Sequence, residues 1–159
     1  TLLDQNGTPL SGWQSIGGVW FYAEPGTGYL ATGLTSIDGT YYYFSSQHEM
    51  SSGWAQSSDG TWYLFASNGA MLTGWQYIDG VWYYLDVATG AMQTGWLSWG
   101  GFWYFLSSNG TMATGWKSID GVLYYFADNG TMQSSDAVMA SKAQSMSSDT
   151  SQHFRWLSR

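Results

Sequence analysis

The feature that most constrains this 159-residue sequence is a Gly-Trp dipeptide that returns every 20 or 21 residues. Gly33-Leu34 fills the one gap in the series, and methionine keeps the same period near the end of most segments. A fixed period of this length is typical of repeat proteins, in which each unit buries its apolar face against its neighbours. Six repeats start at Gly12, Gly33, Gly53, Gly74, Gly95 and Gly115.

Each repeat contains two short strands and two turns. In the repeat that begins at Gly74, residues 75–78 and 81–85 are rich in aromatic and β-branched side chains, which favour strands. Asp79-Gly80 lies between them, and Asp-Gly suits a type I′ hairpin because both central residues need a positive φ. The same turn is expected at Gly17-Gly18, Asp38-Gly39, Asp59-Gly60, Gly100-Gly101 and Asp120-Gly121.

A second turn closes each repeat. His48 stands where most repeats have glycine, and histidine is among the side chains enriched at positive φ. Residues 1–11 have the pattern of the back half of a seventh repeat, with Pro9 at a methionine position, so we expect the chain to be part of a longer protein. Asn-Gly pairs predict the second turn at Asn68-Gly69, Asn109-Gly110 and Asn129-Gly130.

The repeats predict an all-β fold, a solenoid of stacked β-hairpins, because an isolated two-stranded hairpin is marginal in water. Residues 135–159 differ, since they contain no glycine and three of the four lysines and arginines. Ser135-Asp136 followed by residues 137–144 predicts a short, capped C-terminal helix. We therefore predict two regions, a repeat solenoid at 1–134 and a helical tail and linker at 135–159.

Charge and residue types exclude several function classes. The formal net charge of -7 is the wrong sign for a nucleic-acid partner. With no cysteine and two histidines, little is left for a nucleophile or a metal site, and the acidic residues lie in turns rather than as a catalytic pair. No apolar run reaches the ~18 residues of a membrane span. We predict a chain that is not an enzyme and uses no metal or cofactor.

The repeat pattern is Gly-Trp, four residues, Gly, one residue, Trp-Tyr-Tyr, and then Gly-x-Met-x-Thr. It resembles the cell-wall-binding repeats of the choline-binding family, and also the related repeats of glucan-binding domains and clostridial toxins. The resemblance covers residues 1–134. It implies a β-hairpin solenoid that is secreted or surface-attached and that binds choline on teichoic acids or a polysaccharide of a bacterial envelope.

The resemblance also implies that ligand lies between consecutive hairpins, in a box of aromatic side chains with a methionine nearby. A quaternary ammonium donates no hydrogen bond, so aromatic faces and dispersion must hold it. Leu34 and Leu123 depart from the pattern, and we expect no competent site based on either. Transferred to this chain, the ligand-binding residues are Trp13 and Trp20 with the Tyr41–Tyr43 run, Trp54 and Trp62 with Tyr84, Trp75 and Trp82 with Trp103 or Phe105, Trp96 and Trp103 with Tyr125, and the methionines Met71, Met92 and Met112.

Two other functions fit the same residues. Aromatic platforms also stack on sugar rings, so a neutral α-glucan is an alternative ligand. Residues 1–134 hold nine acidic residues and one cation, Lys117, which disfavours a polyanionic teichoic acid and favours a neutral glycan. A stiff stalk without a small-molecule site is the other alternative, because alternate strand residues face opposite sides and many of these rings must be core.

The tail carries a second resemblance. Residues 137–150 are similar to the lead-in to the L,D-transpeptidase domain of some actinobacterial cell-wall proteins, although the cysteine which that family needs is absent. This implies a targeting module of a cell-wall cross-linking enzyme, with a catalytic domain elsewhere in the full-length chain. The alternative for the same residues is a helix that caps the end of the solenoid.

Overall fold

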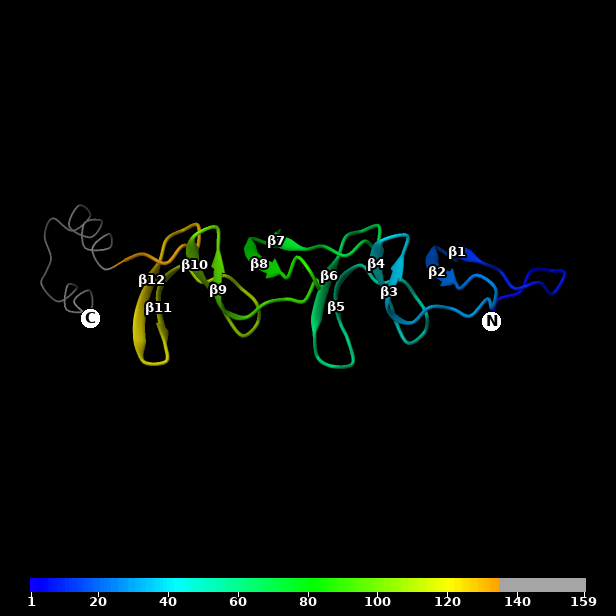
Figure 1. The fold of residues 1–159 in the computed structure, drawn as a ribbon, viewed down its shortest axis with the longest axis horizontal. Helices are drawn as coiled ribbons and strands as arrows, with labels where there is room; N and C mark the ends of the chain where they lie inside the picture. Colours follow the sequence, from blue (N-terminus) through cyan, green and yellow to red (C-terminus); the bar gives the residue numbers. More distant parts are fainter. Residues whose placement is uncertain (135–159) are drawn as a thin grey trace, which may run out of the picture. The chain divides into compact units, whose positions relative to one another are not determined.

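The computed structural model describes residues 1–134 and contains six antiparallel β-hairpins and no helix in that range (Figure 1). The all-β prediction is therefore confirmed, while the predicted tail helix lies outside the described residues. Each hairpin is a two-stranded sheet of consecutive strands. The strands are β1 (Gly12–Ile16), β2 (Val19–Ala23), β3 (Gly33–Ile37), β4 (Thr40–Phe44), β5 (Gly53–Gln56), β6 (Trp62–Phe65), β7 (Gly74–Ile78), β8 (Val81–Leu85), β9 (Gly95–Trp99), β10 (Phe102–Leu106), β11 (Gly115–Ile119) and β12 (Val122–Phe126).

Two-residue turns join the strands of five hairpins. Asp79 and Gly80 have φ values of 50° and 83°, so both central residues are left-handed, as a type I′ turn requires. Asp38 and Asp120 take the same conformation, each followed by a glycine of positive φ. The turn chemistry predicted from the sequence is confirmed at these positions.

The hairpin of β5 and β6 is different. Asp59 does not take a positive φ, although Gly60 does, so the prediction of a tight turn at Asp59-Gly60 is wrong. The physical reason is one inserted residue, which gives a longer loop between Gln56 and Trp62. The Asp59 carboxylate accepts hydrogen bonds from the Ser57 hydroxyl and, at 3.0 Å, from the Thr61 backbone N–H. The Ser57 hydrogen bond and that from Thr61 lower the pKa of Asp59 to about 2.

The second turn also follows the sequence prediction. Gly69, Gly110 and Gly130 all have positive φ, and His48 takes a φ of 69° at the equivalent place. The Asn68 side chain stabilises its turn, because its Oδ1 accepts the backbone N–H of Ala70 at 3.0 Å.

Methionine links each hairpin to the one before it. Met50 forms a β-bridge with Phe44 in its own repeat, while its backbone N–H donates to the carbonyl of Trp20 in the preceding repeat at 2.9 Å. The Leu3–Pro9 bridge repeats the intra-repeat contact at the N-terminus, as expected for half a repeat. Hairpins therefore stack through regular backbone hydrogen bonds. The same donation joins Met71 to Tyr41, Met92 to Trp62, Met112 to Trp82, and Met132 to Trp103.

The most buried side chains are supplied by the last residue of each hairpin's second strand. Burying one such phenylalanine or leucine contributes about 1.5–3 kcal/mol. Each repeat thus contributes one equivalent residue to the core, in addition to other buried residues such as Ala31, Ile37 and Leu64. The equivalent residues are Ala23, Phe44, Phe65, Leu85, Leu106 and Phe126, each no more than 2% exposed.

The chain divides into two compact units. Unit 1 comprises residues 1–76 and 84–92, and unit 2 comprises residues 77–83 and, within the described part of the chain, 93–134. The boundary runs through the hairpin of β7 and β8, whose tip belongs to unit 2. Each unit contains one of the two pockets described below.

Candidate ligand-binding boxes

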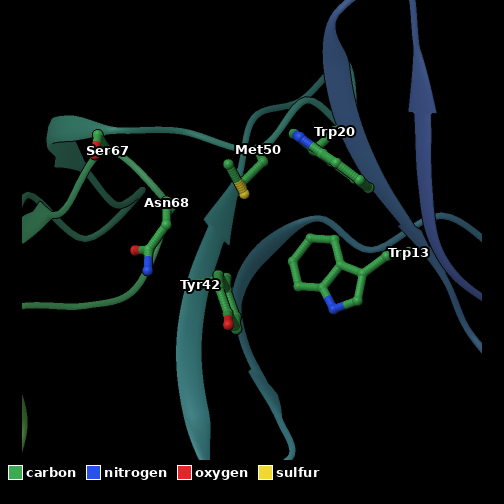
Figure 2. Close-up of a pocket in the computed structure, with 6 residues that line it drawn as sticks. All are labelled: Trp13, Trp20, Tyr42, Met50, Ser67 and Asn68. Carbon is green, nitrogen blue, oxygen red and sulfur yellow. The ribbon is translucent and has the colours of Figure 1, made fainter.

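Unit 1 contains a pocket with a volume of about 440 Å³, which we call box A. The rings of Trp13 and Trp20 meet edge to face, with centroids 6.2 Å apart and planes at 84°. Tyr42, from the next hairpin, lies 4.8 Å from Trp13 at 73°. Together these rings form walls at steep angles around a shared space (Figure 2). The residues that line box A are Trp13, Trp20, Tyr42, Met50, Ser67 and Asn68.

Trp13 belongs to the core as well as to box A. It packs against its cross-strand partner Tyr22 at 5.3 Å and against Phe44 of the next hairpin at 5.9 Å. Tyr42 and Phe44 are two residues apart on β4, so both face the preceding hairpin. Trp20, by contrast, is 44% exposed and forms the outer wall. The fold therefore holds one tryptophan rigidly and leaves the other open to ligand.

Unit 2 contains an equivalent pocket of about 330 Å³, which we call box B, lined by Trp96, Trp103, Tyr124 and Met132. The centroids of Trp96 and Trp103 are 6.2 Å apart with planes at 89°, and Tyr124 lies 4.9 Å from Trp96 at 76°. Trp103 is 48% exposed, in the same role as Trp20. Two boxes of the same geometry thus occur in separate units.

The lining of both boxes suits a quaternary ammonium ion, whose charge is surrounded by apolar methyl groups. Within the described part of the chain, no aspartate, glutamate, lysine or arginine lines either pocket. Aromatic rings present negative faces, and a quaternary ammonium over such a face gains ~0.5–2 kcal/mol for each ring. Methionine adds a polarizable contact. These groups can hold a cation that makes no hydrogen bonds.

Two predicted tyrosines pack on tryptophan rings in the structure. Tyr124 lines box B instead of Tyr125, which packs on Trp116, its cross-strand partner, at 4.9 Å. The reason is strand alternation: neighbouring residues on β12 face opposite sides, and the even-numbered side faces the preceding hairpin. Tyr84 likewise packs on Trp75 at 5.1 Å and is only 7% exposed.

The methionines that line the two boxes differ from the predicted ones. Box A uses Met50 and box B uses Met132, neither of which was predicted. The sulfur of Met71 packs beside Gly90, and that of Met112 packs beside Gly130, both in the second turn of the next repeat. Met92 lies next to the expected tryptophan, because its N–H donates to the Trp62 carbonyl at 2.8 Å.

The remaining predicted tryptophans keep parts of the same arrangement. Trp54 and Trp62 form a third edge-to-face pair, with centroids 6.5 Å apart and planes at 84°. Trp82 accepts the backbone hydrogen bond of Met112 at 2.9 Å, as Trp20 does from Met50. These contacts extend the repeated geometry beyond the two boxes.

Sequence reasoning also missed Ser67 and Asn68, which line box A from the second turn of the third repeat. Asn68 was predicted only as a turn residue. The sequence carried no signal beyond the turn itself; in the structure, a Cβ at Gly69 would collide with the side chain of Met50. That close approach places the turn directly against the box.

Residues 1–134 contain neither a metal-ligand cluster nor a long, apolar helix. That range contains no group of three histidine, aspartate or glutamate side chains that could hold a metal ion. It also contains no helix long and apolar enough to cross a membrane.

Comparison with known families identifies the repeats. A family model described as a choline-binding repeat matches residues 51–94 and 93–136. A second model, for a cell wall binding repeat, matches residues 11–30. The chain belongs to the choline-binding repeat family. The resemblance read from the Gly-Trp pattern is thereby confirmed, and members of this family are binding modules.

Solved structures agree with this assignment. CbpJ from Streptococcus pneumoniae is 40% identical, with a TM-score of 0.73, and the match covers 80% of this chain and 44% of that one. Choline binding protein F from the same species, crystallised in the presence of a peptidoglycan analogue, is 36% identical with a TM-score of 0.74, covering 82% and 48%. The pneumococcal cell wall endolysin of phage Cp-1, complexed with choline, is 27% identical with a TM-score of 0.52, covering 82% and 39%.

The chain spans less than half the length of each of these three structures. No curated protein sequence matches it significantly. The solved structures nevertheless support the predicted fold, a solenoid of stacked hairpins.

Proposed function

We propose that this chain binds choline groups on a bacterial cell-wall polymer such as teichoic acid, at the outer surface of the cell, and contributes binding rather than catalysis. The observation that carries the proposal is the pair of boxes, in which two tryptophans, a tyrosine and a methionine take the same arrangement in both units. Family membership and the choline complex of the endolysin support it.

The distribution of charge is compatible with this ligand. The acidic excess of the repeats attracts a choline cation and repels the phosphates of its polymer, but salt screens both effects beyond ~8–10 Å. A single aromatic box binds choline weakly, and several boxes on one chain raise the overall affinity for a polymer that carries many choline groups. The boxes therefore act as an anchor with several weak contacts.

A site-resolved titration tests the proposal. Each of the 11 tryptophans gives an indole N–H signal in a nitrogen-15 spectrum, so Trp20 reports on box A and Trp103 on box B. We expect choline to shift both signals saturably, and Trp20→Ala to remove binding at box A while box B still binds. The matched control is Trp99→Ala: Trp99 is also exposed but lies on the face of β9 opposite to Trp96.

The alternatives give different outcomes. Saturable shifts with a soluble α-glucan and none with choline would overturn the choline assignment in favour of a glucan-binding domain. No response to either ligand would indicate a structural stalk. The predicted link to an L,D-transpeptidase remains a prediction, because the residues that carry it lie outside the described part of the chain.

A further inference from the structure

Box A has a polar edge. Ser67 and Asn68 line it, and both come from the third repeat, whereas its rings come from the first and second repeats. In the view of Figure 2, these two side chains lie on one side of Met50 and Tyr42, and the tryptophans lie on the other. The pocket therefore has an aromatic end and a polar end.

The turn that carries the polar end is held firmly in place. Gly69 N–H donates to the Ala66 carbonyl at 2.8 Å, and the Asn68 side chain accepts the Ala70 N–H. Gly69 also packs on the side chain of Met50, so the turn cannot withdraw from the box without losing that contact. Asn68 is thus positioned before any ligand arrives.

The orientation of the Asn68 amide follows from the turn. Because the Ala70 N–H needs an acceptor, the oxygen of the amide faces it and the amide nitrogen faces away. That nitrogen donates to no protein group among residues 1–134. Asn68 therefore keeps two N–H bonds without a protein acceptor among residues 1–134, and Ser67, which also lines the pocket, adds a hydroxyl.

A quaternary ammonium cannot use these donors, because it has no acceptor atom. A ligand that carries both an ammonium and an acceptor oxygen a few bonds away can occupy both ends of the pocket. The phosphate ester of choline has this structure, and a hydrogen bond to a charged phosphate oxygen is stronger than one to a neutral acceptor.

We propose that Asn68, assisted by Ser67, is a specificity-determining residue of box A that binds the phosphate of a choline phosphate ester. This inference rests on the proposed function, since it adds a phosphate contact to the same choline box. A neutral donor suits this role in an acidic protein, because it binds phosphate without repelling the choline cation. Box A then prefers phosphocholine to choline, and the preference depends on a repeat that supplies none of its rings.

The decisive variant is Asn68→Asp. An aspartate keeps the turn, because Asp59 accepts the Thr61 N–H in the same way in this repeat, but it replaces both donors with a negative charge. Measured at the Trp20 indole signal, the preference for phosphocholine over choline should fall by roughly ten-fold or more, while choline itself binds as well as before or better.

The matched control is Gln47→Glu. Gln47 occupies the same turn position one repeat earlier and does not line box A. The substitution therefore adds the same negative charge to unit 1 without touching the pocket. We expect it to leave the preference unchanged. An equal loss in both variants would overturn the proposal, because it would reduce the effect to general charge repulsion.

Other outcomes separate this inference from the proposed function. If choline fails to shift the Trp20 signal in the unaltered chain, the choline assignment of box A itself is wrong. If choline and phosphocholine both bind, but Asn68→Asp changes the two affinities equally or not at all, only the role of Asn68 is overturned. Phosphatidylcholine vesicles present the same ester on a lipid, so a Trp20 shift with vesicles, lost in Asn68→Asp, supports the chemistry and identifies the lipid as a carrier.

Discussion

Box A and box B occupy equivalent positions in two separate units, and their rings agree closely. The paired tryptophans are 6.2 Å apart in both, and the inner tryptophan lies 5.9 Å from the buried phenylalanine of the next hairpin in both. Among residues 1–134, a turn of a third repeat lines box A, and no such turn lines box B. The repeat therefore fixes the ring geometry, and the residues around it vary from box to box.

A lysine marks the other difference. Lys117 is the direct cross-strand partner of Tyr124 in box B, whereas Thr35 holds that place opposite Tyr42 in box A. The Lys117 Nζ lies 6.0 Å from the centroid of the Phe105 ring and 3.4 Å from the Ser107 Oγ. The only cation of residues 1–134 thus lies beside a box that we expect to bind a cation.

The largest expected effect tests whether the hairpins that form the two boxes stack with equal stability. Trp13→Ala and Trp96→Ala each remove a ring that packs on two hairpins, so each should destabilise its own stacking by about 3 kcal/mol. Native-state hydrogen exchange at the Met50 and Met132 amides measures this, because each donates across the junction concerned. Losses that differ by more than about 1 kcal/mol would show that equal ring geometry does not mean equal stability.

The next effect concerns the turn that closes box A. Gly69→Ala must tolerate a left-handed φ of 89° and a Cβ that meets the flexible side chain of Met50, so we expect a loss of about 2–3 kcal/mol in protection of the Met50 amide. Gly60→Ala is the control, since its φ is 90° and nothing lies near the added Cβ. It should lose only about 1–2 kcal/mol. Equal losses would mean that the turn does not press on the box.

A smaller effect tests the lysine. Lys117→Gln should tighten choline binding at box B by roughly two-fold, because it removes a like charge near the site, and salt should reduce the change. The reciprocal variant Thr35→Lys should weaken box A by a similar factor. Indole shifts of Trp103 and Trp20 at low and physiological salt measure both. If neither variant changes affinity, the lysine does not distinguish the boxes.

The smallest effect is on acid stability in unit 1. Folding lowers the pKa of Asp59 from 3.8 to about 2, so its stabilisation is present above pH 4 and is lost as the pH falls towards 2. Backbone hydrogen bonds from Thr89 and Ala88 lower the pKa of Asp86, also in unit 1, in the same direction. Urea unfolding, followed at the Trp20 signal, measures the free energy of unfolding. In Asp59→Asn, this free energy should fall less between pH 4 and pH 2.5 than it does in the unaltered chain. A fall as large as in the unaltered chain would contradict this.

Most of the fold could be predicted because it is local. The strands of the repeat at Gly74 were placed within one residue, since turn residues and strand-favouring residues act over short distances. The prediction of a tight turn at Asp59-Gly60 was wrong, and the reason is also local, because one inserted residue lengthens the loop. The paired tryptophans of each box were also predicted, as they recur at fixed places in the repeat.

The sequence by itself determined the period, the hairpins and the tryptophan pairs, because these depend on residues close in the chain. Only the tertiary structure decided that Tyr124 rather than Tyr125 faces box B, that Met50 and Met132 belong to the boxes, and that a third repeat reaches box A. The period shows which positions are equivalent, but not how far each hairpin is turned and shifted against the next. That packing decides which side of a strand meets its neighbour and which turn closes the site.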